Sequence, residues 1–434
     1  MLATALCTIT YWRYAIFRNG VDLGIFSQVI AGLPHGFSST AEGGTNHLLV
    51  HWSPIIAIGW PFVRIFGPLG LQYLQAIAVA AVVFPIWALA RTRFTTAPAF
   101  ALVVVAAIYP TLCANGVGDF HEMAFVPLLS ATLVYALDRR RWSMGVCAAL
   151  LLLCTKEDQF VVLAVNGALF AVTARDGTAK RIGLLVCGMA VAMAVLYFAL
   201  VRPAIDSHAA YESLRFFDWS AAHGEWRTSI GTVLLARLRY LAIMLVPLAF
   251  LPCLSRYGLF MIPGFVEIFA AHQPITMVPG AHYSALVTGY ALAGFVDGAS
   301  RLAALRPHFV KWLVAAGTAA SIWITIFASP MEYWYFLYRF PNAHDVLLER
   351  TLARLPRQAD VGAQDEIFAH LALDPKASIG FGGQRWFVYD RTHYSPRSHA
   401  VDEPAVRRAV DDGRYTVISD RDDIVVLQRT TPAR

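Results

Sequence analysis

Charged residues are scarce in this sequence. Only 15% of its 434 residues are Asp, Glu, Lys or Arg, whereas 57% are hydrophobic and the mean hydropathy is +0.53. A soluble globular domain typically has about 25% charged and about 45–50% apolar residues. The shortage of charge excludes an ordinary soluble core. Because apolar runs of roughly 15–22 residues recur along the chain, which is the length needed to cross a bilayer, the sequence predicts an α-helical polytopic membrane protein.

Cysteine motifs for metal binding or disulfide formation are lacking too. The six cysteines all lie within or at the ends of apolar runs, without the spacing of metal ligands. No nucleotide-binding fingerprint occurs, and the FGGQ stretch at 381–384 is too short and too common to indicate a phosphate loop. The first apolar run starts at Met1 without a basic segment or a small-residue cleavage site, so it does not resemble a cleaved signal peptide.

The apolar runs predict about eleven membrane crossings, with boundaries that are loose by a few residues. Residues 52–67 are also apolar, but they contain two prolines and Arg64, which indicates an interfacial or re-entrant segment. The predicted crossings are 2–17, 71–90, 95–114, 122–138, 142–155, 159–174, 182–201, 238–254, 257–271, 283–300 and 309–329.

Among the short loops between these crossings, basic residues are concentrated in alternate ones. The loops around 115–121 and 272–282 contain no Lys or Arg. Since cytoplasmic loops are enriched in Lys and Arg, the pattern predicts a protein of the cytoplasmic (inner) membrane whose N-terminus lies on the cytoplasmic side. Segments 18–70 and 202–229 are then on the outer side. The net charge of +6 reflects this topology and does not indicate nucleic-acid binding. The basic loops contain residues 91–93, 139–141, 175–181, 256 and 301–311.

The C-terminal tail differs in composition from the rest. Residues 340–434 are rich in Asp, Arg, Gln and Gly and have no apolar run of membrane length. The stretch 344–355 has helical spacing of its apolar residues, whereas YTVISDRDDIVVLQR reads as a hairpin with a polar DRDD turn. The sequence therefore predicts a transmembrane domain over 1–335 and a small extracytoplasmic α/β domain over 340–434.

Acids and histidines gather on the predicted outer face, while bare arginines gather on the inner one. Ionisable groups that converge on one side of a membrane protein are a functional-site hypothesis by default. The outer residues are Asp22, His47, His51, Asp119, His121, Glu122, Lys156, Glu157, Asp158, His272 and His282.

Several of these residues could have either a functional role in catalysis or metal binding or a purely structural role. Asp22 stands just after the first crossing and could act in catalysis or cap a helix. His47 and His51 are spaced i and i+4, which suits a divalent metal if the segment is helical, but two interfacial histidines with ordinary hydrogen bonds would look the same.

The turn GDFHEM packs Asp119, His121 and Glu122 together. These side chains could hold a metal, orient a hydroxyl, or stabilise the start of the following helix. In TKED, Lys156 beside Glu157 and Asp158 suits phosphate handling with base or metal chemistry, although a capping role is also open.

Two further segments bring aromatic residues to the same side. HQPITMVPGAHYSA carries His282 and Tyr283, after Glu267 in an apolar run. The loop 202–229 interleaves aromatics with charges, and this pattern is typical of an interfacial helix or of a lip that holds a lipid-linked substrate.

These motifs carry a resemblance. FRNGVDLGIFSQ, HWSP, GDFHEM, KED and HYSA occur in this order over residues 15–300 and resemble a bacterial family of predicted polytopic membrane proteins annotated only as a domain of unknown function. That family is similar to the GT-C superfamily of membrane glycosyltransferases, which take a sugar from a polyprenyl-phosphate donor on the outer face and keep an acid in the first outer loop.

The resemblance implies that Asp22 is the general base or a metal ligand. GT-C first loops often show paired acids, but Asp22 stands alone here, so its partner would come from the later outer acids, with Glu157 and Asp158 as further catalytic candidates. The lipid phosphate would meet Lys156, Arg202 and the histidines, or a divalent metal (Mg or Mn) held by His47, His51 and His121. Asp119, Glu122, His282 and Tyr283 would bind substrate.

Two other functions remain compatible with the sequence. A transporter or flippase of a lipid-linked or polar solute would explain the many crossings, but it predicts internal repeats and broken helices near the midplane. A non-catalytic assembly protein that binds partners through its outer tail predicts that the outer acids could be lost without effect.

Overall fold

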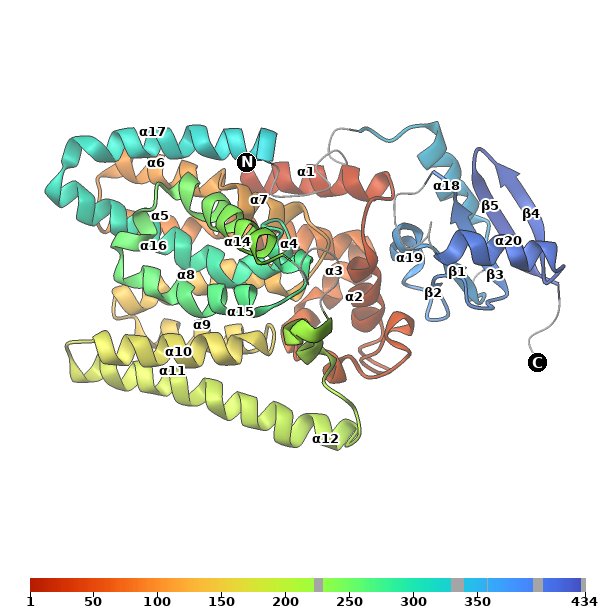
Figure 1. Ribbon diagram of the computed structural model, residues 1–434, viewed down its shortest axis with the longest axis horizontal. Coiled ribbons are helices and arrows are strands. Elements are labelled where there is room, and N and C mark those ends of the chain that lie inside the picture. The colour runs from red at the N-terminus through yellow and green to blue at the C-terminus, as the bar shows by residue number, and fades with distance from the viewer. Residues whose placement is uncertain (222–228, 329–338, 357, 393–400, 431–434) are drawn as a thin grey trace.

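The computed structural model describes residues 1–221, 229–328, 339–356, 358–392 and 401–430. Residues 1–328 form a helical body whose longer helices run side by side, and residues 339–430 form a smaller sheet-containing C-terminal region at one end of that body (Figure 1). The predicted helical fold with a small C-terminal α/β unit is thus confirmed.

The helical body is built from α-helices connected by short 3-10 turns. The 3-10 turns used below are η2 (His47–Leu49), η4 (Glu122–Phe125), η10 (Arg256–Met261) and η12 (His282–Ser284). The α-helices are α1 (Leu2–Ala15), α2 (Val21–Ala31), α3 (Trp60–Phe66), α4 (Leu69–Ala81), α5 (Val83–Arg91), α6 (Thr96–Ala107), α7 (Pro110–Val117), α8 (Val126–Asp138), α9 (Trp142–Leu153), α10 (Asp158–Thr173), α11 (Gly177–Val195), α12 (Arg202–Ile205), α14 (Ile230–Leu245), α15 (Ile262–Ala270), α16 (Ala285–Leu305) and α17 (Pro307–Trp323).

Fewer helices reach membrane-spanning length than the sequence predicted. Among the described residues, four helical segments are long and apolar enough: Leu69–Arg91, Gly177–Ile205, Ile230–Leu248 and Pro307–Phe327. Helices α6 and α7 count as a fifth if they form one span, with a bend of 51° between them. The bend lies at Tyr109, because the proline that follows pushes this residue out of the helical conformation. The predicted number of eleven crossings is not confirmed.

Two predicted segments have a different local structure. The crossing expected at 257–271 consists of the 3-10 turn η10 and the nine-residue helix α15. Gly258 lies so close to the Pro252 carbonyl that a side chain would overlap it, so the chain is folded back here and cannot run as one straight helix. The expected outer loop 18–70 in turn contains the helices α2 and α3.

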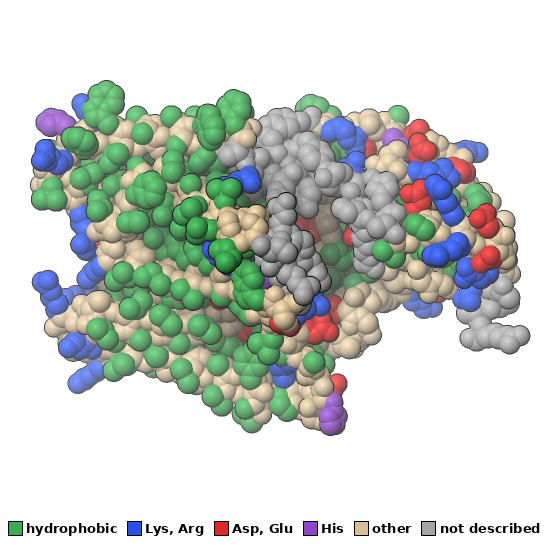
Figure 2. All heavy atoms as spheres, in the orientation of Figure 1, with side chains coloured by type: hydrophobic (Ala, Val, Ile, Leu, Met, Phe, Trp, Pro, Cys, Tyr) green, Lys and Arg blue, Asp and Glu red, His purple; other side chains and the backbone are tan. Residues whose placement is uncertain are grey.

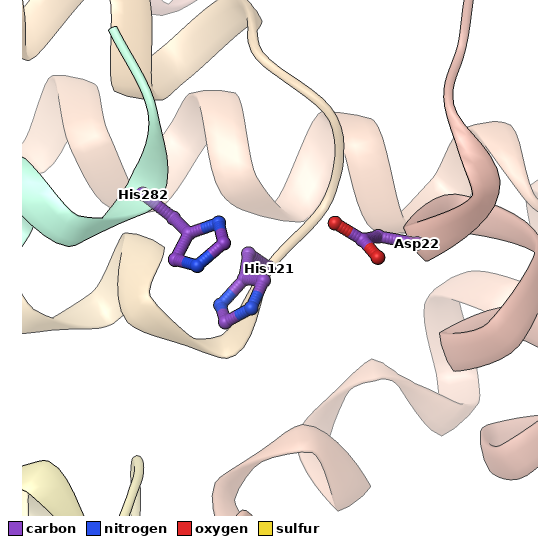
Figure 3. Close-up of side chains that lie close together, drawn as sticks. All are labelled: Asp22, His121 and His282. Carbon is purple, nitrogen blue, oxygen red and sulfur yellow. The ribbon is translucent and has the colours of Figure 1, made fainter. Parts of the chain in front are cut away.

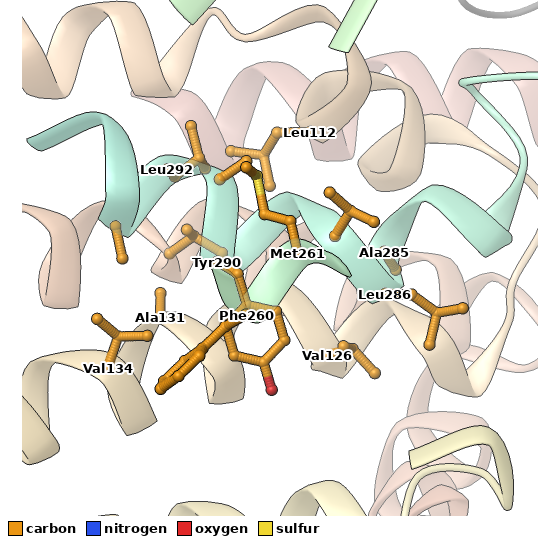
Figure 4. Close-up of a cluster of buried hydrophobic side chains, with 14 of the residues drawn as sticks. Leu112, Val126, Ala131, Val134, Phe260, Met261, Ala285, Leu286, Tyr290 and Leu292 are labelled. Atoms are coloured by element: carbon orange, nitrogen blue, oxygen red, sulfur yellow. The ribbon is translucent and has the colours of Figure 1, made fainter. Parts of the chain in front are cut away.

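Small residues allow close helix packing within the body. Helices α10 and α11 approach at Gly167 and Gly183, where a Cβ atom on either glycine would lie 2.6 Å from a backbone nitrogen of the other helix. Such contacts between small residues are a common means of helix association in membranes. Larger apolar side chains, among them Leu112, Phe260 and Tyr290, fill the centre of the body (Figure 4).

Apolar side chains also cover much of the outside of the helical body, while charged ones gather at its two ends (Figure 2). The end far from the C-terminal region carries mainly Lys and Arg on the face shown, whereas the C-terminal region carries both signs of charge. This distribution suits a body with an apolar belt in contact with lipid.

The C-terminal region contains one five-stranded sheet, with strands in the order β2-β1-β3-β5-β4. Strand β1 is parallel to β2 and β3, whereas β5 is antiparallel to β3 and β4. The hairpin predicted around DRDD is confirmed, with Asp422 and Asp423 at positive φ in its turn. The strands are β1 (Val361–Ala363), β2 (Ser378–Ile379), β3 (Trp386–Asp390), β4 (Tyr415–Arg421) and β5 (Ile424–Arg429), and the helices are α18 (Ala343–Ala353), α19 (Asp365–Leu371) and α20 (Glu403–Asp411).

Helices α2 and α19 join the two parts of the molecule. The ring of Phe368 in α19 lies where a side chain on Gly24 would be, so the two helices are in direct contact. His370 is stacked between Tyr14 and Phe17, with ring centroids 4.0 and 3.9 Å apart. The C-terminal region is therefore packed onto the helix that begins at Val21.

Candidate functional site

A cavity of about 270 Å³ lies at the end of the helical body nearer the C-terminal region. We call it the His–Asp cavity. The loop 202–221 and helix α15 contribute its apolar walls, among them Phe216, Phe217 and Ile268. Its ionisable lining residues are Asp22, His51, His121, Lys156, Asp158, Glu267, His282 and Tyr283.

Asp22, His121 and His282 converge on one wall of this cavity. One potential ligand atom from each lies within 4.8 Å of those of the other two. The two imidazole rings are stacked, with centroids 3.5 Å apart and planes at 10°, and the carboxylate of Asp22 points toward His121 (Figure 3). The three side chains come from α2, from the turn before η4 and from η12, so only the folded chain brings them together.

Asp22 is placed by the way α2 begins. The Asp119 carboxylate accepts hydrogen bonds from the Leu23 amide at 3.1 Å and from the Asn19 side chain at 3.3 Å. Asp119 thus anchors the first turn of α2, which contains Asp22. It faces a second cavity of about 390 Å³, which shares Asp22, His121 and His282 with the first.

Polar residues of α4 place His121. The Gln75 side chain accepts a hydrogen bond from the His121 amide at 3.0 Å and donates to the carbonyls of Gly118 and Asp119. Glu122 is fully buried, and one of its oxygens lies 3.0 Å from His121 Nδ1. The glutamate therefore supports the histidine from behind and does not line the cavity.

The KED triplet is divided between two environments. Lys156 and Asp158 line the cavity, 3.4 Å apart, and the Lys156 ammonium lies 5.7 Å from the ring centre of Tyr283. Glu157 points elsewhere, where it accepts hydrogen bonds from the Trp52 amide and the Tyr211 hydroxyl and contacts His51 at 2.8 Å. Lys156 and Asp158 therefore line the cavity, whereas Glu157 does not.

The predicted metal ligands are only partly brought together. His47 and His51 do not share a helix, because η2 is a single 3-10 turn that ends at Leu49. Both ring nitrogens of His47 are engaged, with Glu42 at 2.8 Å and Ser53 at 3.0 Å. Of the three histidines predicted as metal ligands, only His121 belongs to the group of potential ligand atoms that the structure brings together. The other two members of that group are Asp22 and His282.

Arg202 lies apart from the cavity lining. Its guanidinium donates hydrogen bonds to the carbonyls of Ala209 and Ala210 and lies 4.9 Å from the ring centre of Tyr211. It shapes the loop that covers the cavity. The segment 222–228 of the predicted loop 202–229 lies outside the described residues.

The electrostatics of the cavity follow from burial and from the mixture of charges. Burial, with the negative charge of Asp119, raises the pKa of Asp22 to about 7. Burial lowers the pKa of both His121 and His282 well below the usual value, so that both rings are neutral at pH 7. Burial lowers the pKa of Lys156, but the negative charges of Asp158, Glu122 and Glu157 together hold it well above its usual value.

Neutral imidazoles and a carboxylate make a mixed nitrogen and oxygen donor set. Such a set suits Mn²⁺ or Zn²⁺, whereas Mg²⁺ prefers oxygen ligands and keeps several waters. The donor types present suit a divalent metal and favour manganese over magnesium. Because the two stacked imidazole planes are nearly parallel, with ring centroids 3.5 Å apart, both rings can ligate one ion only if one of them rotates.

Sequence reasoning did not assign roles to several residues that build the site. Tyr211 and Gln75 were missed, and Glu267 was noticed only as a lone acid in an apolar run. A signal was present for two of them, because an acid and a glutamine within apolar runs are costly unless they have a specific environment.

The fold and the cavity define a helical membrane protein with a charged site at one end of its helical body. The chain belongs to the family described as "Predicted membrane protein (DUF2079)", which matches residues 13–426. The resemblance seen in the sequence is thus confirmed. No curated protein sequence matches the chain.

A solved structure has a similar fold over nearly the whole chain. It is the crystal structure of ArnT from Cupriavidus metallidurans bound to undecaprenyl phosphate, with a TM-score of 0.56 and 10% sequence identity. The match covers 98% of this chain and 97% of that chain. At this identity the similarity shows a shared fold.

Proposed function

We propose that the protein is a membrane glycosyltransferase that moves a sugar from a polyprenyl-phosphate donor to an acceptor on the outer face of the cytoplasmic membrane. The observation that carries the proposal is the convergence of Asp22, His121 and His282 on a cavity that also contains Lys156. A carboxylate and an ammonium in one partly closed cavity supply the two charges that such a transfer requires. The GT-C-like fold, shared with an ArnT that binds undecaprenyl phosphate, supports this class of donor.

In the proposed reaction, the Asp22 carboxylate takes the proton of the acceptor hydroxyl. The acceptor oxygen then forms a bond to the anomeric carbon of the sugar, and the bond from that carbon to the phosphate oxygen breaks. The phosphate leaves with the electron pair, and the Lys156 ammonium offsets its charge. A carboxyl with a pKa of about 7 is well matched to this role, because a base is most effective when its pKa is near the working pH.

The remaining predicted site residues support these two groups. Asp158 orients the Lys156 ammonium, and Glu157 fixes the segment at His51 and Trp52. Aromatic side chains from loop 202–221 and Tyr283 offer walls for the sugar ring.

A divalent metal fits the same site as an alternative role for Asp22. Asp22, His121 and His282 would hold the ion, which would supply positive charge to the leaving phosphate. Asp22 would then act as a ligand and not as the base. Asp158 or Glu267, both in the cavity lining, would be the next candidates for proton transfer.

The position of the charged residues favours an enzyme over a transporter. Asp22, His121, Lys156 and His282 all lie at helix starts, toward one end of the body. A transporter of the inverted-repeat type would be expected to bind its solute near the midplane.

Binding of undecaprenyl phosphate to the full-length protein tests the proposed donor class, with native mass spectrometry in detergent as the measurement. We expect binding that Lys156→Gln weakens by at least about tenfold, since a hydrogen bond to a charged group is worth roughly 1.5–3 kcal/mol. Lys311→Gln, a change of the same type at an exposed site on α17, should leave binding unchanged. Lys156→Arg, which keeps the charge, should retain most of the binding if the fold is intact. No binding to the wild type, or equal loss in both Gln variants, would contradict the proposal.

The proposed orientation has its own test. In a variant without the native cysteines, of which Cys147 and Cys253 are exposed, a membrane-impermeant maleimide added from outside should label Lys376→Cys and not Arg140→Cys. Both positions are exposed, at opposite ends of the molecule. The reverse pattern would put the His–Asp cavity on the cytoplasmic side.

A further inference from the structure

The C-terminal region contains a pocket of its own. It has a volume of about 440 Å³, which is in the range of small-molecule sites, about 300–1,000 Å³. Three of its eight lining residues are arginines, and none is acidic. Its lining includes Phe381, Gly383, Arg408, Arg414, Tyr415 and Arg429. We call it the arginine pocket.

The three arginines come from separate elements. Arg408 lies on α20, Arg414 precedes β4, and Arg429 ends β5. Helix α20 lies beside the sheet (Figure 1) and is packed onto it through Val406 and Ala409, which leaves Arg408 at the surface. An ordinary solvated face would carry its charges along one helix or strand. Here the tertiary fold brings arginines from three separate elements to the same pocket.

The FGGQ stretch forms one wall of the arginine pocket. Gly383 has φ +98°, a backbone conformation that L side chains rarely adopt, and its carbonyl accepts a hydrogen bond from Arg429 at 2.8 Å. This bond fixes the position of the Arg429 guanidinium. The Phe381 and Tyr415 rings, 4.9 Å apart, add an aromatic surface.

Little negative charge compensates these arginines. Arg414 contacts Asp412 at 3.1 Å, but both side chains are about 60% exposed, and such a pair contributes little. Within the described part of the chain Arg408 makes no ion pair. Its neighbour Arg407, by contrast, is paired with Glu403 at 2.8 Å and lies outside the pocket.

We propose that the arginine pocket binds the anionic group of a sugar-sized ligand, either a phosphate or a carboxylate. Arginine matches both groups because its planar guanidinium donates two parallel hydrogen bonds to paired oxygens. The aromatic wall would contact the sugar ring. This site is distinct from the His–Asp cavity and does not depend on the proposed glycosyltransferase activity.

Titration calorimetry on the full-length protein in detergent tests this site. The probes are glucose 1-phosphate, glucuronate and uncharged glucose. We expect one of the two anions to bind and glucose not to bind, and the stronger anion identifies the ligand class. Arg408→Gln should weaken binding by at least about tenfold, as expected for the loss of a charge-assisted hydrogen bond.

Arg407→Gln is the control, because it removes the same charge one residue away, and it should bind as the wild type does. Equal losses in Arg407→Gln and Arg408→Gln would show only general surface charge and would overturn the proposal. So would unchanged binding in Arg408→Gln, equal binding of glucose, or no anion binding up to about 10 mM, where the binding free energy falls below roughly 3 kcal/mol.

Discussion

The helical body carries a network of charged side chains at each of its two ends, and the two networks differ in how completely their polar atoms are paired. At the end with the basic loops, Arg93 contacts Asp138 at 2.6 Å and Asp297 at 2.9 Å. All four carboxylate oxygens have partners, since Ser255 and Arg301 complete those of Asp297 and Tyr257 adds to Asp138. We call this set the basic-end network.

At the other end, the charges surround open space. Asp22, Lys156 and His282 face a cavity, and the buried Glu122 carboxylate behind them contacts the His121 ring at 3.0 Å. Helix α8 connects the two ends, since it begins beside Glu122 and ends at Asp138. The same residue types thus build a closed structural network at one end and line an open cavity at the other. Satisfied buried groups stabilise a fold, whereas unsatisfied ones mark a place where a partner is expected.

The largest expected effect is on activity, at the open end. Asp22→Asn should reduce sugar transfer from a polyprenyl-phosphate donor in reconstituted membranes by about 10²–10⁴-fold, because the proton acceptor or ligand oxygen is lost. Its thermal stability should stay the same or rise slightly, since the raised pKa shows that the Asp22 charge is unfavourable in the fold. Asp206→Asn, at an exposed carboxylate on loop 202–221, is the matched control and should remain active. Full activity of the Asp22→Asn variant would show that Asp22 has no role in sugar transfer, and the open end would then have no functional advantage over the closed one.

The next effect is on stability, at the closed end. Arg93→Gln should destabilise the protein by about 2–4 kcal/mol, because it leaves the largely buried carboxylates of Asp138 and Asp297 with only the more exposed Arg256 and Arg301 as charged partners. The measurement is the midpoint of heat unfolding in detergent. Transfer activity per folded molecule should not change, since this network lies at the far end of α8 from the cavity. If the variant instead lost activity and kept its stability, the two ends could not be assigned separate roles.

A smaller effect is expected where the C-terminal region meets α2. Gly24→Val should cost about 1–3 kcal/mol through overpacking against Phe368, and it should lower activity too, because the same helix carries Asp22. Gly188→Val is the matched control, since a side chain there meets no neighbour within 4 Å. Combining Gly24→Val with Phe368→Ala should recover part of the loss. Unchanged activity in the single variant would show that the cavity tolerates shifts of α2.

The mildest effect concerns His344 on α18, which contacts Asp390 at 2.8 Å and Asp422 at 3.0 Å. Burial lowers its pKa, but the hydrogen bonds to Asp390 and Asp422 and the charges of these two carboxylates together raise it more, so the folded pKa lies above the usual 6.5. The stabilisation is fully present below about pH 6.5 and is lost as the pH rises through the folded pKa. The unfolding midpoint should therefore fall slightly between pH 6 and about pH 8 in the wild type and less in His344→Gln, with His308→Gln, exposed on α17, as the control. An equal fall in both variants would show that this pair is not a stabilising contact.

Composition and periodicity were sufficient for the class of protein and for several elements. Low charge and long apolar runs identified a helical membrane protein, and the spacing around residues 344–355 and 415–429 identified a helix and a hairpin that the structure contains. These features are local, since they depend on residues within one turn or one strand pair. The same local signals predicted more crossings than the described residues have helices of membrane-spanning length, because an apolar run such as 257–271 can fold into short turns once prolines and glycines interrupt it.

The tertiary structure decided which of the charged residues meet. Asp22 and His282 are 260 positions apart in the sequence, and no spacing rule relates them. His47 and His51 have the i, i+4 spacing of metal ligands on a helix, but the segment between them is a single 3-10 turn and not a helix. Glu157 follows Lys156 directly, yet it turns away because the Trp52 amide and Tyr211 bind it elsewhere. The three arginines of the arginine pocket lie beside the FGGQ stretch only because the C-terminal region folds as it does. Local charge and hydropathy predict a side of the membrane for each segment, but distances within a site are set by the packing of helices that are remote in the chain.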